Sequence, residues 1–315
     1  MRHQQTLAKS SFLSGIGLHS GNPTSITIHP APPNTGVVFV KHVADHFQSC
    51  PATISFLGKT DHCTTLQAID FQIQTVEHVL GALAGLEIDN AYVELQGTET
   101  PAADGSAAPF VDILQQCGIL TQEVPRTYLK IVQPISVEDG QRSITVLPSA
   151  LPTITYFIDF PHPLIQQQKY QHSCTPHEFQ KNIAGARTFA FRKEVEFLWS
   201  RGLGLGGSLY NTVVFSDTGL VNEDELRFPN ECVRHKVLDL IGDLSLLGIP
   251  VIGHFIAKCA GHALHAQLVQ AILKNPDKWI ILNAGKTGKE HLLHRNTFPA
   301  STVDLPELQP AFHSL

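Results

Sequence analysis

TVEHVLGALAG, at residues 75–85, and CVRHKVLDLIGD, at residues 232–243, both place apolar residues at helical spacing. The two stretches align at an offset of 157 (235 − 78), which puts His78 opposite His235. Valine, leucine and glycine residues also coincide at this offset. We therefore expect two similar helices, each carrying one histidine, from two halves of one molecule.

The segments that follow these helices agree as well. Residues 86–89 match residues 247–250 at an offset of 161 (247 − 86), which is four more than 157. One extra helical turn in the second half would account for the difference. We infer an ancient duplication, and the alternative is a chance match between two amphipathic helices.

The order of expected elements also repeats. In each half β-strands come first and helices follow, which predicts an α+β fold with two similar halves. Breaker clusters delimit the strands, and apolar periodicity with glycine stops delimits the helices. The expected strands are residues 25–29, 36–41, 90–95, 127–134, 142–147, 153–159 and 249–257, and the expected helices are residues 75–85, 192–201, 229–247, 264–273 and a helix capped by Ser106 that ends at Gly118.

The polar segment QEVPR, at residues 122–126, has the composition of a linker between the halves. It divides the chain into a first domain, residues 1–122, and a second domain, residues 127–285. Residues 286–315 show no clear period, so we expect a C-terminal tail of uncertain order.

The composition is that of an ordinary globular protein. The chain has 315 residues, 43% apolar and 16% charged, which fits two domains. A net charge of −6 argues against a general nucleic-acid binder. Six scattered cysteines without a C-x-x-C pair disfavour a cysteine zinc site and a disulfide framework. Without a secretory h-region or a membrane-length apolar run, we expect a cytoplasmic monomer with no nucleic-acid partner and no stable membrane insertion.

His235 and Asp239 are spaced i and i+4, so they share one face of the second helix and can grip one ion. Alone, such a pair is more often a surface or capping contact. His78 on the matching helix would complete two histidines and one carboxylate with an open fourth position, the pattern of a catalytic zinc site. We therefore expect these three residues to bind zinc, although iron(II) favours similar ligands.

Neighbouring residues are candidates for proton transfer. Glu77 points about 100° away from His78 on a helix, so it would face bound water as a general base and not bind the ion. The H-E-x-x-H spacing of zinc peptidases is absent. His262 follows an expected buried strand and, as an imidazolium, would protonate a leaving amine, with Asp243 orienting it. Taken alone, His262 is an ordinary strand-end histidine.

Several motifs together carry a resemblance to one family. On these motifs, over residues 5–285, the chain resembles the zinc-dependent UDP-3-O-(3-hydroxyacyl)-N-acetylglucosamine deacetylases of lipid A biosynthesis. The motifs are GLHSG (17–21), TVEH (75–78), DGSAAPF (104–110), ARTF (186–189), LGGS (205–208), VRHKVLDLIGD (233–243) and GH (261–262).

The resemblance implies a fold and a reaction. The fold would be two similar two-layer α/β sandwich domains packed against each other, with a small insert in the second domain. The reaction would release acetate and leave a free amine on the sugar. The implied roles fall on His78, His235 and Asp239 as zinc ligands, Glu77 as the base, His262 as the acid, Asp243 as its support and Thr188 as a hydrogen-bond donor to the oxyanion.

The resemblance also implies how a UDP-linked acylated amino sugar would bind. An insert near residues 190–214 would form an apolar groove for the acyl chain. Lys236 would meet the diphosphate, and Phe189 would wall the sugar. Each groove residue has ordinary core packing as its alternative. The groove residues would be Leu18, Val195, Trp199, Leu209 and Val214.

Two other classes of function stay open at this point. A different zinc amidohydrolase would act on a peptide or another acyl-amino sugar, and a peptide enzyme would not need Lys236 or an apolar insert. A non-enzymatic acyl carrier or scaffold would have structural histidines and bind no metal.

Overall fold

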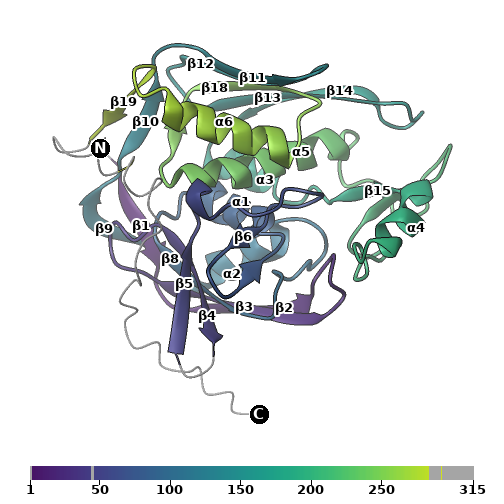
Figure 1. Ribbon diagram of the computed structural model, residues 1–315, viewed down its shortest axis with the longest axis horizontal. Coiled ribbons are helices and arrows are strands. Elements are labelled where there is room, and N and C mark those ends of the chain that lie inside the picture. Colours follow the sequence, from purple (N-terminus) through teal and green to yellow (C-terminus); the bar gives the residue numbers. More distant parts are fainter. Residues whose placement is uncertain (1, 44–45, 284–291, 293–315) are drawn as a thin grey trace.

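The computed structural model describes residues 2–43, 46–283 and 292. These residues form an α+β fold, as the sequence predicts. Two five-stranded sheets lie on opposite sides of the molecule, and most of the helices lie between them (Figure 1). Within the described ranges, no helix has both the length and the apolar character needed to cross a bilayer.

The first five-stranded sheet is built from residues 11–96. Its strands lie in the order β2-β3-β8-β4-β5, and only β4 and β8 are parallel neighbours. In β3, Ile26 and Ile28 are buried and alternate with polar residues, because successive strand residues face opposite sides of the sheet. The strands are β2 (Ser11–Ile16), β3 (Pro23–Pro30), β4 (Val37–Val43), β5 (His46–Pro51) and β8 (Ala91–Gln96).

The second five-stranded sheet repeats this topology. Its order is β11-β12-β18-β13-β14, and only β13 and β18 are parallel neighbours. Each of its strands therefore has a counterpart at the same place in the first sheet, which confirms the expected pair of similar halves. The strands are β11 (Ile135–Asp139), β12 (Arg142–Leu147), β13 (Thr153–Phe160), β14 (Gln166–Ser173) and β18 (His254–Lys258).

Most of the helices pack between the two sheets (Figure 1). Helix α2 packs on the first sheet and α5 and α6 pack on the second, while α1 packs against both α2 and α5. A 3₁₀-helix, Ser245–Leu247, continues α5 and supplies the extra turn expected in the second half. The helices are α1 (Glu77–Gly85), α2 (Ala108–Cys117), α3 (Pro176–Asn182), α4 (Arg192–Ser200), α5 (Glu231–Leu244) and α6 (His262–Lys274).

One continuous apolar core joins the two halves. Leu80 and Leu83 of α1 and Val237 and Leu240 of α5 are buried in it. Burying a side chain of this size stabilises the fold by about 1.5–3 kcal/mol. Because α1 and α5 are packed together in the middle of this core, side chains from both halves meet along their contact.

The prediction that residues 122–126 form a linker is wrong. These residues lie mostly in β9 (Ile119–Pro125), which pairs antiparallel with β1 (His3–Leu7). The side chains of β9 are exposed or half-buried, so the strand has the polar composition of a loop. Pro125 is tolerated because it ends a strand of a two-stranded ribbon.

One expected strand is shortened and another is divided. Residues 127–134 form β10 (Tyr128–Ile131) and then leave the strand before Pro134, which has no amide proton for a sheet. Residues 249–257 form β17 (Val251–Ile252) and β18, separated at Gly253, where a Cβ atom would lie 2.8 Å from Val146. Strands β17, β10 and β19 (Trp279–Leu282) form a separate sheet that the sequence does not predict.

The expected insert is a small unit of its own at the right of Figure 1. Strands β15 (Phe189–Phe191) and β16 (Val213–Phe215) are parallel, and α4 lies between them in the chain. Two short strands, β6 (Leu66–Gln67) and β7 (Gln72–Ile73), and a 3₁₀-helix, Ile54–Phe56, precede α1.

The helix boundaries differ from expectation by small amounts. The N-cap of α2 is Ala107, although the hydroxyl of Ser106 accepts a hydrogen bond from the Ala108 amide at 3.2 Å. Helix α6 begins at His262 and not at Leu264. The expected tail, residues 286–315, lies outside the described residues apart from Leu292.

Candidate metal centre and active site

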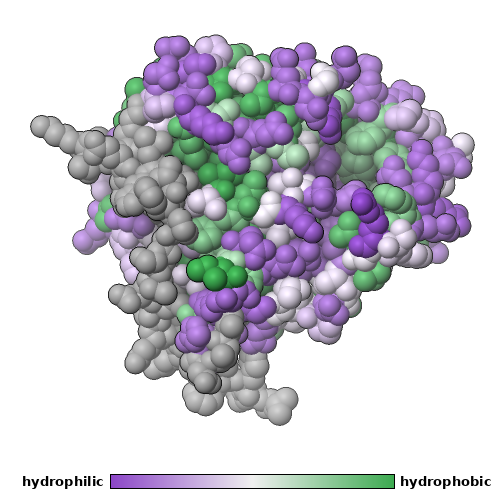
Figure 2. All heavy atoms as spheres, viewed as in Figure 1, coloured by the Kyte–Doolittle hydropathy of each residue, from purple (hydrophilic) through white to green (hydrophobic). Residues whose placement is uncertain are grey.

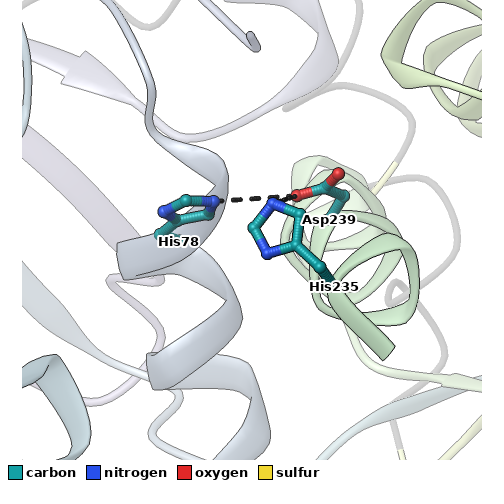
Figure 3. A group of neighbouring side chains, drawn as sticks. All are labelled: His78, His235 and Asp239. Atoms are coloured by element: carbon teal, nitrogen blue, oxygen red, sulfur yellow. Dashed lines mark ion pairs between the residues drawn. The ribbon is translucent and has the colours of Figure 1, made fainter. Parts of the chain in front are cut away.

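His78, His235 and Asp239 meet at the contact between α1 and α5 (Figure 3). Asp239 Oδ1 lies 3.7 Å from His78 Nε2 and 3.4 Å from His235 Nε2. One ligand atom from each residue lies within 4.8 Å of the others, and all three residues are buried. The structure therefore brings together the three side chains that the sequence predicts as metal ligands.

The spacing of these atoms fits a metal ion. Tetrahedral ligands at the usual zinc distances lie about 3.3–3.5 Å apart, and Asp239 Oδ1 lies at 3.4 and 3.7 Å from the histidine nitrogens. Two imidazoles and one carboxylate are ligands that zinc and iron(II) both accept. The three residues thus form a candidate metal centre.

Neighbouring groups orient two of the ligands. His235 Nδ1 lies 3.0 Å from the carbonyl oxygen of Ala186, and donating a proton there leaves Nε2 free for an ion. Lys236 Nζ donates to Asp239 Oδ2 at 2.8 Å, which leaves Oδ1 toward the histidines. Burial lowers the pKa of His235 to about 3, so the imidazole is neutral at pH 7. Burial would raise the pKa of Asp239, but His235 and Lys236 hold it well below its usual range. Both side chains therefore stand in the protonation state that a metal ligand needs.

A strained turn sets the start of α1. Thr75 has φ +60°, which is rare for a β-branched residue. Its hydroxyl donates to Glu99 Oε1 at 2.7 Å, and its carbonyl oxygen accepts from the Thr100 hydroxyl at 2.5 Å. Glu99 is buried and also accepts two backbone amides of the GLHSG loop. This anchored turn presents Glu77 and His78 as the first two residues of α1.

Glu77 precedes His78 at the start of α1, next to the candidate metal centre. Its Oε2 accepts the Thr64 amide proton at 3.0 Å, and its Oε1 lies 4.0 Å from His262 Nε2. Burial raises the pKa of Glu77 to about 6, against the opposing effects of His262 and His78. A carboxylate with this pKa can accept a proton near neutral pH, as a general base must.

His262 is the first residue of α6, and its Nε2 faces Glu77 Oε1. Its Nδ1 lies 2.8 Å from Asp243 Oδ2, and its Nε2 lies 3.9 Å from Asp239 Oδ2. Burial would lower the pKa of His262, but the Asp243 carboxylate raises it to about 9. The imidazole is therefore charged at neutral pH and can act as an acid.

Comparison with known proteins identifies one enzyme family over most of the chain. A sequence profile of the family described as UDP-3-O-acyl N-acetylglycosamine deacetylase (LpxC) matches residues 4–274. The chain is 44% identical to the UDP-3-O-acyl-N-acetylglucosamine deacetylase of Myxococcus xanthus over 282 residues, 90% of each chain. It is 41% identical to that of Syntrophus aciditrophicus over 279 residues, 89% of each chain. This chain belongs to that deacetylase family. The predicted enzyme class is thereby confirmed, and a non-enzymatic scaffold is excluded.

In this deacetylase two further predicted residues, Phe189 and Lys236, lie beside His235, and Thr188 adjoins Phe189 in the chain. The ring centroid of Phe189 is 6.5 Å from that of His235, and Lys236 Nζ is 5.7 Å from the Phe189 centroid. Thr188 lies in the same segment as Ala186, whose carbonyl oxygen faces His235. The amide of Thr188 donates to the Gly105 carbonyl oxygen at 2.8 Å. The side chain of Lys236 is 22% exposed and contacts the candidate metal ligand Asp239.

The insert of the deacetylase presents apolar side chains to its surface. Trp199 is 53% exposed and Leu209 is 46% exposed, so neither is ordinary core. Val195 and Val214 are half-buried. The backbone of Leu18 reaches the insert, because its carbonyl oxygen accepts the Gly206 amide proton at 3.0 Å. Figure 2 shows hydrophobic atoms interspersed with hydrophilic ones over the part of the molecule where α4 and β15 lie.

Sequence reasoning missed a histidine and a threonine of the site. His265 Nδ1 lies 2.8 Å from Asp243 Oδ2, and its spacing from His262 on one helix was a usable signal. Asp243, His262 and His265 also lie close enough together to form a second possible metal site. In this structure both histidines instead form hydrogen bonds with the Asp243 carboxylate. Thr64 contacts Glu77, Asp243 and His262, and it lies in a segment without periodicity.

A buried ion pair beside the site was missed as well. Arg187 Nε donates to Glu231 Oε1 at 2.9 Å, and the side chains are 4% and 1% exposed. The Arg187 amide donates to the same oxygen at 2.9 Å. The pair therefore ties the segment that carries Thr188 to the first turn of α5.

Proposed function

We propose that this deacetylase removes the N-acetyl group of UDP-3-O-(3-hydroxyacyl)-N-acetylglucosamine, in lipid A biosynthesis, with one zinc ion bound by His78, His235 and Asp239. The three proposed ligands lie close together, and Glu77 and His262 lie next to them. This arrangement supports metal-assisted hydrolysis of the amide. The names of the similar relatives support the substrate.

The residues around the centre divide the chemistry between them. A bound zinc ion would polarise the acetyl carbonyl and lower the pKa of bound water toward about 7. Glu77 would accept one proton from the water that attacks the carbonyl carbon. His262, kept charged by Asp243, would give a proton to the nitrogen as the C–N bond breaks. Thr188 would donate a hydrogen bond to the oxygen that gains negative charge.

Other residues would hold the rest of the substrate. Lys236 is a partly exposed cation beside the centre and suits the diphosphate, and Phe189 next to it suits one face of the sugar. The exposed Trp199 and Leu209 suit an acyl chain. With Leu18, Val195 and Val214 they would line its groove.

The proposal extends to the metal and the compartment. Zinc and iron(II) favour similar nitrogen and oxygen ligands, and zinc is the ion we assign. All six cysteines are free, which suits the reducing cytoplasm where a UDP-sugar is used. We propose that the enzyme acts there as a monomer.

Acetate release tests this function. Metal-stripped protein should release little acetate from the substrate, and one equivalent of zinc should restore release. UDP-N-acetylglucosamine without the acyl chain serves as the matched control and should be a far poorer substrate. Protein that binds one zinc ion but releases no acetate would be a zinc amidohydrolase with a different substrate. Protein that neither binds zinc nor releases acetate would contradict the proposal entirely.

A further inference from the structure

Thr64 lies between the proposed base and the proposed acid. It is 1% exposed, and its carbonyl oxygen accepts the amide proton of Val76 just before α1. Its amide donates to Glu77 Oε2 at 3.0 Å, and its hydroxyl donates to Asp243 Oδ1 at 2.5 Å. The hydroxyl oxygen also lies 3.2 Å from His262 Nδ1. One residue thus contacts functional groups on α1, α5 and α6.

The number of protons fixes the direction of these bonds. A threonine hydroxyl has one proton to donate, and a carboxylate only accepts. Asp243 Oδ2 lies 2.8 Å from Nδ1 of both His262 and His265, so Oδ1 is the oxygen left for Thr64. With both oxygens engaged, the carboxylate is held in a single orientation.

The orientation of Asp243 in turn sets that of the acid. Because Nδ1 of His262 is bound to Asp243, its Nε2 faces Glu77 Oε1 across 4.0 Å. The Thr64 amide occupies the other oxygen of Glu77, so Oε1 is the oxygen that remains for proton transfer. The backbone and the side chain of Thr64 therefore place the base and the acid on opposite sides of one gap.

We propose that Thr64 is a positioning residue of the deacetylase, whose hydroxyl orients the Asp243–His262 pair with respect to Glu77. This inference rests on the proposed function. The hydrogen bonds of the Thr64 hydroxyl described above go to proton-transfer groups and not to the three metal ligands. The hydroxyl therefore supports the chemical step and not the binding of metal or substrate.

The variants Thr64→Val and Thr64→Ser distinguish the contribution of the hydroxyl group from that of the methyl group. Valine keeps the shape and the backbone amide but leaves Asp243 Oδ1 without its donor. We expect kcat for acetate release to fall about 10- to 100-fold in Thr64→Val, with KM and zinc content unchanged. Thr64→Ser, the matched control, should keep nearly the full kcat. If Thr64→Val does not fold, Thr64→Ala carries the same test because it also lacks the hydroxyl.

The Asp243→Ala background adds a readout that packing alone would not move. If the hydroxyl acts through Asp243, Thr64→Val should cause no further loss in that background. Additive losses would overturn the proposal, as would wild-type kcat in Thr64→Val or equal losses in the valine and serine variants. These results would leave the proposed function intact. A wild-type enzyme that holds zinc but releases no acetate would overturn the proposed function and, with it, this inference.

Discussion

Gly242 of α5 rests directly on the backbone of Glu77 in α1. A Cβ atom at Gly242 would lie 2.0 Å from the Glu77 carbonyl oxygen, far inside normal contact distance. A Cβ atom at Gly81 would likewise lie 2.8 Å from Leu238 Cδ1. The absence of side chains at these glycines lets the two ligand-bearing helices approach closely enough for His78 to meet His235.

Gly242→Ala should therefore damage stability and metal binding together. The new methyl group must push α1 away, which we expect to lower the free energy of unfolding by about 1–3 kcal/mol. Denaturant unfolding and competition with a chelator measure the two effects. Gly219→Ala is the matched control, because its Cβ would lie 3.7 Å from Ser216 Oγ in ordinary contact. Unchanged zinc affinity in Gly242→Ala would show that the helix spacing does not control the centre.

Asp239→Ala should lower zinc affinity by about 10-fold or more, because it removes one of three ligands. Asp243→Asn is a matched control on the same helix. Its side chain contacts Thr64, His262 and His265 and should leave the zinc content unchanged. Metal analysis of both variants checks the assignment. Equal loss in the two variants would mean that the centre is not the one assigned here.

Glu77→Ala should keep zinc and lose activity by roughly 10²–10⁴-fold, because a general base contributes about that much. Initial rates of acetate release, measured with the metal content of each sample, separate the two properties. Full activity in a zinc-loaded Glu77→Ala enzyme would remove Glu77 from its role.

The rate of acetate release should show a bell-shaped dependence on pH. Glu77 has to be ionised, so activity should rise as the pH passes the pKa of about 6. His262 has to be protonated, so activity should fall as the pH passes about 9. Asp243→Asn removes the anion that raises the pKa of His262, and it should move the alkaline limb to lower pH. A profile that is flat from pH 5 to 9 would contradict this pairing.

His172 should make the fold sensitive to acid. It is 1% exposed on β14, its ring nitrogens have no hydrogen-bond partner in the described part of the chain, and burial lowers its pKa from 6.5 to about 4. Between these values the unfolded state binds the proton and the folded state does not, so stability falls as the pH decreases from 6.5 to 4. The loss should reach about 3 kcal/mol near pH 4.

His172→Leu should flatten this part of the stability curve, measured by denaturant unfolding at several pH values. His3→Gln, which changes an exposed histidine, should keep the wild-type slope. If His172→Leu lost stability with acid as steeply as the wild type, other groups would have to cause the effect.

The sequence predicted the helices, the two similar halves and the three candidate metal ligands because helix periodicity, a repeated motif and an i, i+4 spacing can all be read along the chain. The i and i+4 spacing of His235 and Asp239 needs only one helix, and the repeat then points to His78. Thr64 gave no such signal, since it reaches Asp243 across 179 positions from an irregular segment. The strand β9 was hidden for a related reason: its partner β1 is more than a hundred residues away, and its exposed side chains resemble those of a loop.

The two matching helices show a division of labour. At the offset of 157, Ala82 stands opposite Asp239, Leu86 opposite Asp243, and Glu77 opposite Arg234. By the proposed roles, a molecule assembled from two first halves would have two bases but no carboxylate for the metal ion. One assembled from two second halves would have ligands and no base. The two similar halves therefore supply different groups to the proposed site, and neither supplies those of the other.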